Sequence, residues 1–392
     1  MIEIKARLVR EQTAVFLAGE SIECFVTFTN PQRPQHKIAQ SNSDILENLA
    51  WATVSIQCYC NTTLKKDKTM DDAPSTSTSL ANSLLKQGSL VVAAQPKFLF
   101  CDLRLEPGET KSYLYRDELP KTGPPTYRGV RVKYFYKITI ATQRVGSKVQ
   151  LLNVPVRVLP KPDFENESAI AEICDDTNDN VAPANPFLEK KKTESYLEVI
   201  LHYLQNISSR RCPNFYVITN KRGRVGRFCL FKQNYKLGED IVGTLDFTSQ
   251  TVKCVQYSVT LQCEEIVKES DESQDSTNQS ESTHELISAV TSFTKHHEVC
   301  IGMLETQIIL PVPLHVTPSF KTDQVDVRWR LHFQFVTTTS ANMTPECEPG
   351  ETWQAPEDIE IETMMWNLNV QILPTNPLQI SAPSGVHTLT IK

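Results

Sequence analysis

Residues 19–28 read GESIECFVTF and residues 238–247 read GEDIVGTLDF, so a Gly-Glu pair leads twice into the same kind of alternating segment. Four further pairs of similar segments follow in the same order in the two halves of the chain. They are VSIQC at 54–58 with VTLQC at 259–263, PKTGPPTY at 120–127 with PLHVTPSF at 313–320, VKYFYKITI at 132–140 with VRWRLHFQF at 327–335, and VRVLP at 156–160 with VQILP at 370–374. Five pairs in one order indicate a duplicated domain.

Each repeated segment alternates between apolar and polar positions with a period of two, which is the pattern of a half-buried strand. In 132–140 one face is apolar, and the other, which carries Lys133, Lys137 and Thr139, is expected to meet water. Turn signals such as Pro-Gly-Glu at 107–109 separate the segments. Several short strands with such turns in each half predict an all-β protein with two β-sandwiches in tandem.

The repeat also predicts the domain boundaries. We expect a first sandwich over 1–160, a linker over 161–211, a second sandwich over 212–375 and a C-terminal tail over 376–392. Such lengths allow two domains with cores of ordinary size.

Three regions break the strand pattern. Segments at about 61–95 and about 267–292 are rich in polar residues and are expected to be flexible insertions. Within the linker, Leu197, Ile200, Leu201 and Leu204 have helical spacing, which predicts a short amphipathic helix near 194–206. We expect its apolar stripe to pack on a sandwich; the alternative is a partner's groove.

Composition narrows the function classes. The chain has 392 residues and a formal net charge of −6, so we expect no nucleic-acid binding. No apolar run approaches the roughly 20 residues of a membrane-spanning helix, and the first residues lack the apolar region of a signal peptide. We therefore expect a cytoplasmic protein.

Motifs for catalysis are absent from the sequence. There is no Gly-x-Ser-x-Gly, no phosphate-binding Gly-rich loop before Lys-Ser/Thr, and no His-Glu-x-x-His. Among 11 cysteines, Cys58 and Cys60 come nearest to a metal half-site, but no second pair at ligand spacing accompanies them, so they are interpreted as buried apolar residues. The sequence predicts no enzyme, no metal and no cofactor.

Basic residues gather in two sets. One interpretation is that these are solvated faces of strands and loops. The other is a surface for an acidic partner or an anionic membrane, where each basic residue adds about 1 kcal/mol. The first set is Arg128, Arg131 and Lys133, followed by Lys137; the second is Arg210 and Arg211 with Lys221, Arg222, Arg224 and Arg227.

Several segments together resemble a known family. The Gly-Glu turn before an alternating strand, PPTYRG at 124–129 and the strand after it resemble the arrestin-like fold of two tandem sandwiches, here with one short helix in the connecting region. Several segments more closely resemble the Rgp subunits of Ric/Rgp complexes, which are partner proteins in Rab exchange factors. The segments are FLFCDLRLEPGE at 98–109, VAP at 181–183 with PFLE at 186–189, LGEDIVGTL at 237–245 and WRLHF at 329–333.

This resemblance implies a heterodimer with a larger, propeller-containing Ric-type subunit. It implies a cytoplasmic complex, peripheral on the Golgi membrane, that promotes GDP release from a Rab-six-type GTPase in endosome-to-Golgi retrograde transport. This chain would be a non-catalytic scaffold and specificity subunit. An exchange factor binds the nucleotide-free GTPase more tightly than the nucleotide-bound form, so its site is an interface.

Two hypotheses about binding remain. In the first, the sandwiches hold the larger subunit and help to select the GTPase, whose C-terminal tail adds to an exposed strand edge. In the alternative, the chain is an arrestin-type cargo adaptor that links sorting signals to a coat.

Overall fold

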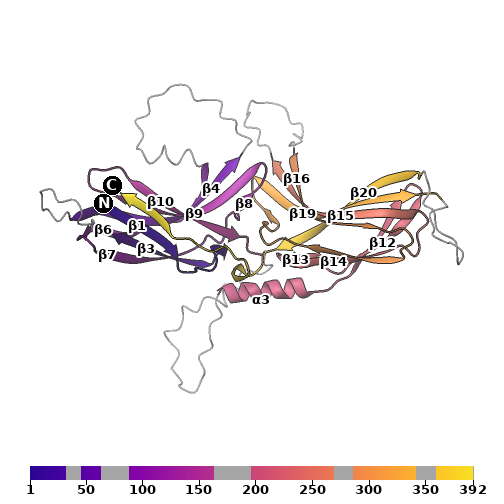
Figure 1. Ribbon diagram of the computed structural model, residues 1–392, viewed down its shortest axis with the longest axis horizontal. Helices are drawn as coiled ribbons and strands as arrows, with labels where there is room; N and C mark the ends of the chain where they lie inside the picture. Colours follow the sequence, from indigo (N-terminus) through magenta and orange to yellow (C-terminus); the bar gives the residue numbers. More distant parts are fainter. Residues whose placement is uncertain (32–45, 63–87, 163–195, 269–285, 341–358, 392) are drawn as a thin grey trace, which may run out of the picture. The chain divides into compact units, whose positions relative to one another are not determined.

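The computed structural model describes residues 1–31, 46–62, 88–162, 196–268, 286–340 and 359–391. Within these stretches the regular elements are strands, apart from helix α3 (Tyr196–Ser209) and the 3-10 turn η2 (Pro377–Gln379). The chain divides into unit 1, Met1–Ile200 with Asn376–Lys392, and unit 2, Leu201–Thr375. The predicted all-β class is confirmed (Figure 1).

Unit 1 contains two sheets. Its strands are β1 (Ile2–Leu8), β2 (Val15–Leu17), β3 (Ser21–Thr29), β4 (Glu47–Thr62), β5 (Ser89–Ala93), β6 (Lys97–Leu105), β7 (Thr110–Glu118), β8 (Tyr127–Arg128), β9 (Val132–Gln143), β10 (Gln150–Leu159) and β21 (His387–Ile391). One sheet has the order β21-β1-β3-β7 and the other β2-β10-β9-β4-β5, with β6 on β4 and β8 on β9. Phe28 of the first sheet meets Phe100 of the second with ring centroids 5.0 Å apart, so the sheets share an apolar core.

Unit 2 repeats this plan. Its strands are β11 (Asn214–Asn220), β12 (Gly223–Leu230), β13 (Asn234–Lys236), β14 (Asp240–Asp246), β15 (Lys253–Lys268), β16 (Leu286–Val299), β17 (Glu305–Pro311), β18 (Phe320–Lys321), β19 (Val325–Thr338) and β20 (Ile361–Leu373). The orders are β11-β12-β14-β17 and β13-β20-β19-β15-β16, with β18 on β19. Phe228 and Phe333, one from each sheet, have ring centroids 4.9 Å apart.

The two Gly-Glu pairs form the same turn in both units. Gly19 and Gly238 each have a φ of +83°, a left-handed conformation that favours glycine. In each copy the glutamate carboxylate accepts the backbone N–H of the residue three positions earlier, at 2.9 Å in unit 1 and 3.0 Å in unit 2. The strand just before each turn runs parallel to its neighbour, β2 to β10 and β13 to β20. The sequence repeat therefore corresponds to a repeat in structure.

The alternating strands place one face in the core, as expected, but two of the three residues expected to meet water are buried. Lys133 is exposed, whereas Lys137 and Thr139 are buried. The Nζ of Lys137 lies 4.2 Å from the centroid of the Tyr59 ring on the adjacent strand, and Thr139 Oγ1 donates to Gln57 Oε1 at 3.0 Å. Burial lowers the pKa of Lys137. The middle of this sheet is thus covered on both faces.

Some of the predicted boundaries need correction. The segment 376–392, expected as a tail, contributes β21 to unit 1, where β21 pairs with β1 from Ile2 opposite Ile391 to Ala6 opposite His387. The expected insertions are narrower than 61–95 and 267–292, because β4, β5, β15 and β16 extend into them. Residues 63–87 and 269–285 of these insertions, and the linker over 163–195, lie outside the described residues.

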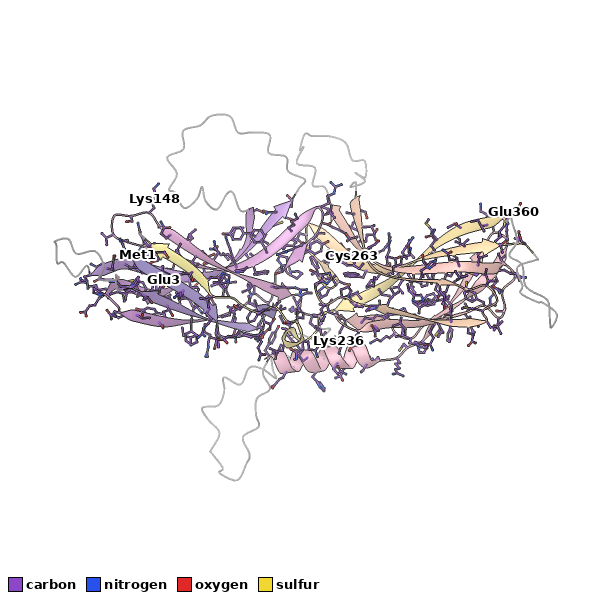
Figure 2. The ribbon with its side chains drawn as sticks, viewed as in Figure 1. Met1, Glu3, Lys148, Lys236, Cys263 and Glu360 are labelled. Atoms are coloured by element: carbon purple, nitrogen blue, oxygen red, sulfur yellow. The ribbon has the colours of Figure 1, made fainter. Side chains whose placement is uncertain are left out.

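The linker helix is confirmed and runs from Tyr196 to Ser209. At its start, Tyr196 Oη donates to the Ala18 carbonyl at 3.2 Å within unit 1. Near its end, Lys236, which Figure 2 labels, donates through its Nζ to Gln205 Oε1 at 2.8 Å within unit 2. Of the predicted stripe, Ile200 and Leu204 are buried, and Leu197 and Leu201 are half-buried. The stripe therefore packs on this chain's own residues.

Glu298 of β16 accepts one hydrogen bond from its own sheet and one from the other sheet of unit 2. Tyr257 Oη of β15 and Thr306 Oγ1 of β17 each donate to Glu298 Oε2 of β16 at 2.6 Å. The hydrogen bond from Thr306, followed by that from Tyr257, holds the pKa of the Glu298 carboxyl below its ordinary value.

This lowered pKa predicts a dependence of stability on pH. A carboxyl whose pKa falls on folding stabilises the folded state above its unfolded pKa of about 4.3, and that contribution is lost as pH falls through the folded pKa. Glu298→Gln is therefore expected to lower the free energy of unfolding near neutral pH and to matter less in acid. Urea unfolding at about pH 7 and about pH 3 measures both differences. A loss of the same size at both pH values would contradict the assignment, and Glu118→Gln, at an exposed position, is the control.

Candidate partner-binding surfaces

The first predicted basic set lies together on the β8–β9 hairpin of unit 1. Arg128 of β8 is directly opposite Lys133 of β9, and Arg131 lies in the turn between them beside the exposed Val130. Arg157 of β10 belongs with them, because desolvation and then the positive charge of Arg128 lower the pKa of its guanidinium. Sequence reasoning missed Arg157, since only strand pairing brings it near the hairpin.

The second predicted set divides into three places. Lys221 and Arg222 form the turn between β11 and β12, and Arg224 follows at the start of β12. The Asn220 side chain accepts the backbone N–H of Arg222 at 2.9 Å, which shapes this turn. Arg222 Nε also lies 3.4 Å from Glu362 Oε2 at the beginning of β20. We call Lys221, Arg222 and Arg224 the basic turn.

Arg227 lies apart from the basic turn, on the outer face of β12. Its Nη2 donates to Asp246 Oδ2 at 3.0 Å, and its guanidinium carbon lies 5.2 Å from the centroid of the Phe215 ring. These residues line a groove of about 330 Å³ together with Glu305 and Gln307 of β17. The groove carries charges of both signs, so it is not a simple anion site.

Arg210 and Arg211 follow the end of α3 and are exposed. Within the described part of the chain neither forms an ion pair with a side chain. The nine predicted residues therefore do not form one patch within a unit. Three lie on the unit 1 hairpin and six are spread over unit 2.

A second feature that sequence reasoning missed is the side of unit 2 between β11 and β20, which we call the open side. Across it, the rings of Tyr216 and Trp366 have centroids 5.4 Å apart. Large apolar side chains remain exposed along both strands. They are Phe215 (61%), Val217 (59%), Ile361 (60%) and Met365 (66%).

Three further features bear on what the described residues can bind: the cysteine pair, clusters of metal-ligating side chains, and long apolar helices. Cys58 and Cys60 are both buried, and burial raises the pKa of the Cys58 thiol to about 12, so that thiol stays protonated. Within the stretches that the structure describes, no three His, Cys, Asp or Glu side chains are grouped to hold a metal ion. In those same stretches no helix has the length and apolar character to span a bilayer.

Comparison with known proteins places the chain in a family. A family profile, Rgp1, matches residues 20–178 and 165–338, which together cover most of both units. The chain belongs to the Rgp1 family. Its relatives in the family include a human protein named RAB6A-GEF complex partner protein 2, which is 40% identical over 407 aligned residues covering 100% of both chains. A bovine protein of the same name is 40% identical over 386 residues, covering 95% of this Rgp1 chain and 93% of its own.

Proposed function

We propose that this chain is a non-catalytic scaffold and specificity subunit of a heterodimeric guanine-nucleotide exchange factor for a Rab6-type GTPase on the Golgi. The observation that carries the proposal is the 40% identity, over the whole of both chains, to a human protein named as a partner in a RAB6A exchange complex. The paired sandwiches support it, because they offer sheet edges and faces for binding.

The division of labour follows from what exchange requires. An exchange factor accelerates GDP release by binding the nucleotide-free GTPase more tightly than the nucleotide-bound form. We propose that a larger, propeller-containing subunit makes most contacts with the nucleotide-binding fold. This chain would hold that subunit and help to select the GTPase in endosome-to-Golgi transport.

The proteins that accompany the chain in cells test this proposal. Purification of the tagged full chain is expected to yield a larger propeller-containing subunit and a Rab6-type GTPase. Recovery of coat or ubiquitin-ligase components without these two would instead support an arrestin-type cargo adaptor.

We further propose that the C-terminal tail of the GTPase binds a strand edge of this chain, because extended segments add to such edges through backbone hydrogen bonds. A tail-deleted and a tail-swapped GTPase should bind the complex more weakly than the intact one. Equal affinity for all three would rule out this part of the proposal.

The predicted basic residues are proposed to face an acidic partner or an anionic membrane. Replacing Lys221, Arg222 and Arg224 by glutamate should weaken binding to anionic liposomes or to the larger subunit at least about a hundredfold, at about 1 kcal/mol for each residue. The control is the same change in charge at the exposed Arg104, Lys111 and Lys148, the last of which is labelled in Figure 2. If the triple variant binds the liposomes and the larger subunit as tightly as the wild type does, these residues form a solvated turn and not a binding surface.

A further inference from the structure

Strand β20 has a long free edge. It pairs with β19 from Ile361 to Val370, whereas β13 occupies its other edge only at Gln371–Leu373. No described strand lies on that other edge between Ile361 and Asn369. None of these edge residues is buried, although every second residue of β19 from Val325 to Phe335 is buried.

Unit 1 allows a comparison, because β10 occupies the same place in its sheet as β20 does in unit 2. The repeat aligns VRVLP with VQILP, so Leu152 and Val154 of β10 correspond to Trp366 and Leu368 of β20. In β10 the edge beside Leu152 and Val154 also has no described strand, since β2 pairs only with Arg157–Leu159, yet Leu152 is 7% exposed and Val154 is 0% exposed. Trp366 and Leu368 remain half-exposed in unit 2. The interior side chains beside this edge are therefore buried in unit 1 and half-exposed in unit 2.

The free edge has apolar side chains on both of its faces. Met364, Trp366 and Leu368 point toward the sandwich interior, and Ile361 and Met365 point outward. An edge with unpaired backbone groups is a template for another strand, and large exposed apolar side chains mark an interaction site. A strand added here would continue the β20–β19 sheet and cover the half-exposed interior side chains.

Charge distinguishes the two ends of this edge. Arg222 of the basic turn lies 3.4 Å from Glu362, at the beginning of β20. Lys221 and Arg224 add two further positive charges to that turn. The far end of the edge, at Asn369, carries an uncharged side chain. An occupant with acidic residues at one end would fit in one direction only.

We propose that an extended segment of the larger subunit binds as an added strand along Ile361–Asn369 of β20. Its alternate apolar side chains cover Met364, Trp366 and Leu368, and acidic residues at one of its ends lie beside the basic turn. This assignment rests on the proposed function, because it names the surface through which this chain holds its partner.

A second copy of this chain fits the edge less well. Two β20 strands related by a twofold axis run antiparallel, so the basic turn of each copy would face the Asn369 end of the other. That end offers no carboxylate from β20 itself, since the acidic side chains of this strand region, Glu360 and Glu362, lie at its beginning (Figure 2 labels Glu360). The charge at the basic turn thus favours a different, acidic partner chain.

The test uses full-length chain co-expressed with the larger subunit. The double variant Ile361→Glu and Met365→Glu places two carboxylates on the free edge and is expected to weaken the complex by about 30-fold or more, as at an interface hot spot. Its own fold should be unaffected because both positions are exposed. The matched control, Val145→Glu and Leu304→Glu, changes two comparably exposed apolar residues elsewhere and should leave binding unchanged.

Hydrogen exchange gives a second readout. Backbone amides of residues 361–369 should exchange more slowly in the complex than in the free chain, whereas those of the β5 edge should not change.

If the wild-type chain binds but the double variant binds equally well and these amides gain no protection, the edge assignment is wrong and the proposed function stands. If the wild-type chain binds no larger subunit, the proposed function itself fails. If the wild type self-associates, and the double variant abolishes self-association but still binds the larger subunit, the edge belongs to a second copy and the inference is wrong.

Discussion

Phe333→Ala is expected to lower the free energy of unfolding by about 3–5 kcal/mol, the usual cost of removing a buried phenylalanine ring. Phe333 is fully buried on β19. Its ring meets those of Phe228 and Trp366, each at a centroid distance of 4.9 Å, and it stacks on Phe335 at 5.8 Å. The substitution therefore leaves a cavity between the two sheets of unit 2 and removes several aromatic contacts.

Urea unfolding of the full chain, followed by circular dichroism, measures this loss. The control is Phe215→Ala, which removes the same atoms from a side chain that is 61% exposed and should cost far less. Equal losses for the two variants would contradict the placement of Phe333 at the centre of the sandwich.

Gly243→Ala is the second variant with a large expected effect. Gly243 lies on β14, inside the repeated segment, and a Cβ there would come within 2.6 Å of the Phe228 ring and 2.8 Å of the Cys229 carbonyl oxygen. The ring is buried and the carbonyl belongs to the neighbouring strand, so neither can move away freely. We expect a loss of about 3 kcal/mol, as for other overpacked core positions.

Two comparisons separate this clash from the general effect of replacing glycine. Gly385→Ala adds a Cβ where nothing lies within 4 Å and should be nearly neutral. Adding Phe228→Leu to Gly243→Ala should recover part of the loss, because it removes the ring that the new Cβ meets. A near-neutral Gly243→Ala would show that β12 and β14 are not packed as described.

The fold could be predicted from sequence because the repeat provides two independent copies of each strand pattern. The strand at 132–140 shows the limit of that reasoning. Lys137 is buried although its place in the alternation predicted exposure, because Tyr59 of the neighbouring strand covers its amine. The strand β21 was missed for a related reason, since HTLTI is a short segment whose pairing with β1 depends on contacts distant in sequence.

The candidate surfaces were predictable only in part. The basic turn and the β8–β9 hairpin are local in sequence, so charge clustering was enough to find them. The free edge of β20 could not be found in this way, because its sequence, IETMMWNLN, resembles that of any strand with apolar residues on both faces. Whether a neighbouring strand covers it is a property of the sheet order, which the two units share at this edge, whereas the burial of the interior side chains beside it differs between them.

We propose that this chain acts in nucleotide exchange only as a subunit. The most direct test of this proposal is the rate of GDP release from a Rab6-type GTPase with this chain alone, with the larger subunit alone and with both. We expect no acceleration by this chain alone and the fastest release with both subunits present. Acceleration by this chain alone, or a rate with the larger subunit that this chain leaves unchanged, would contradict it.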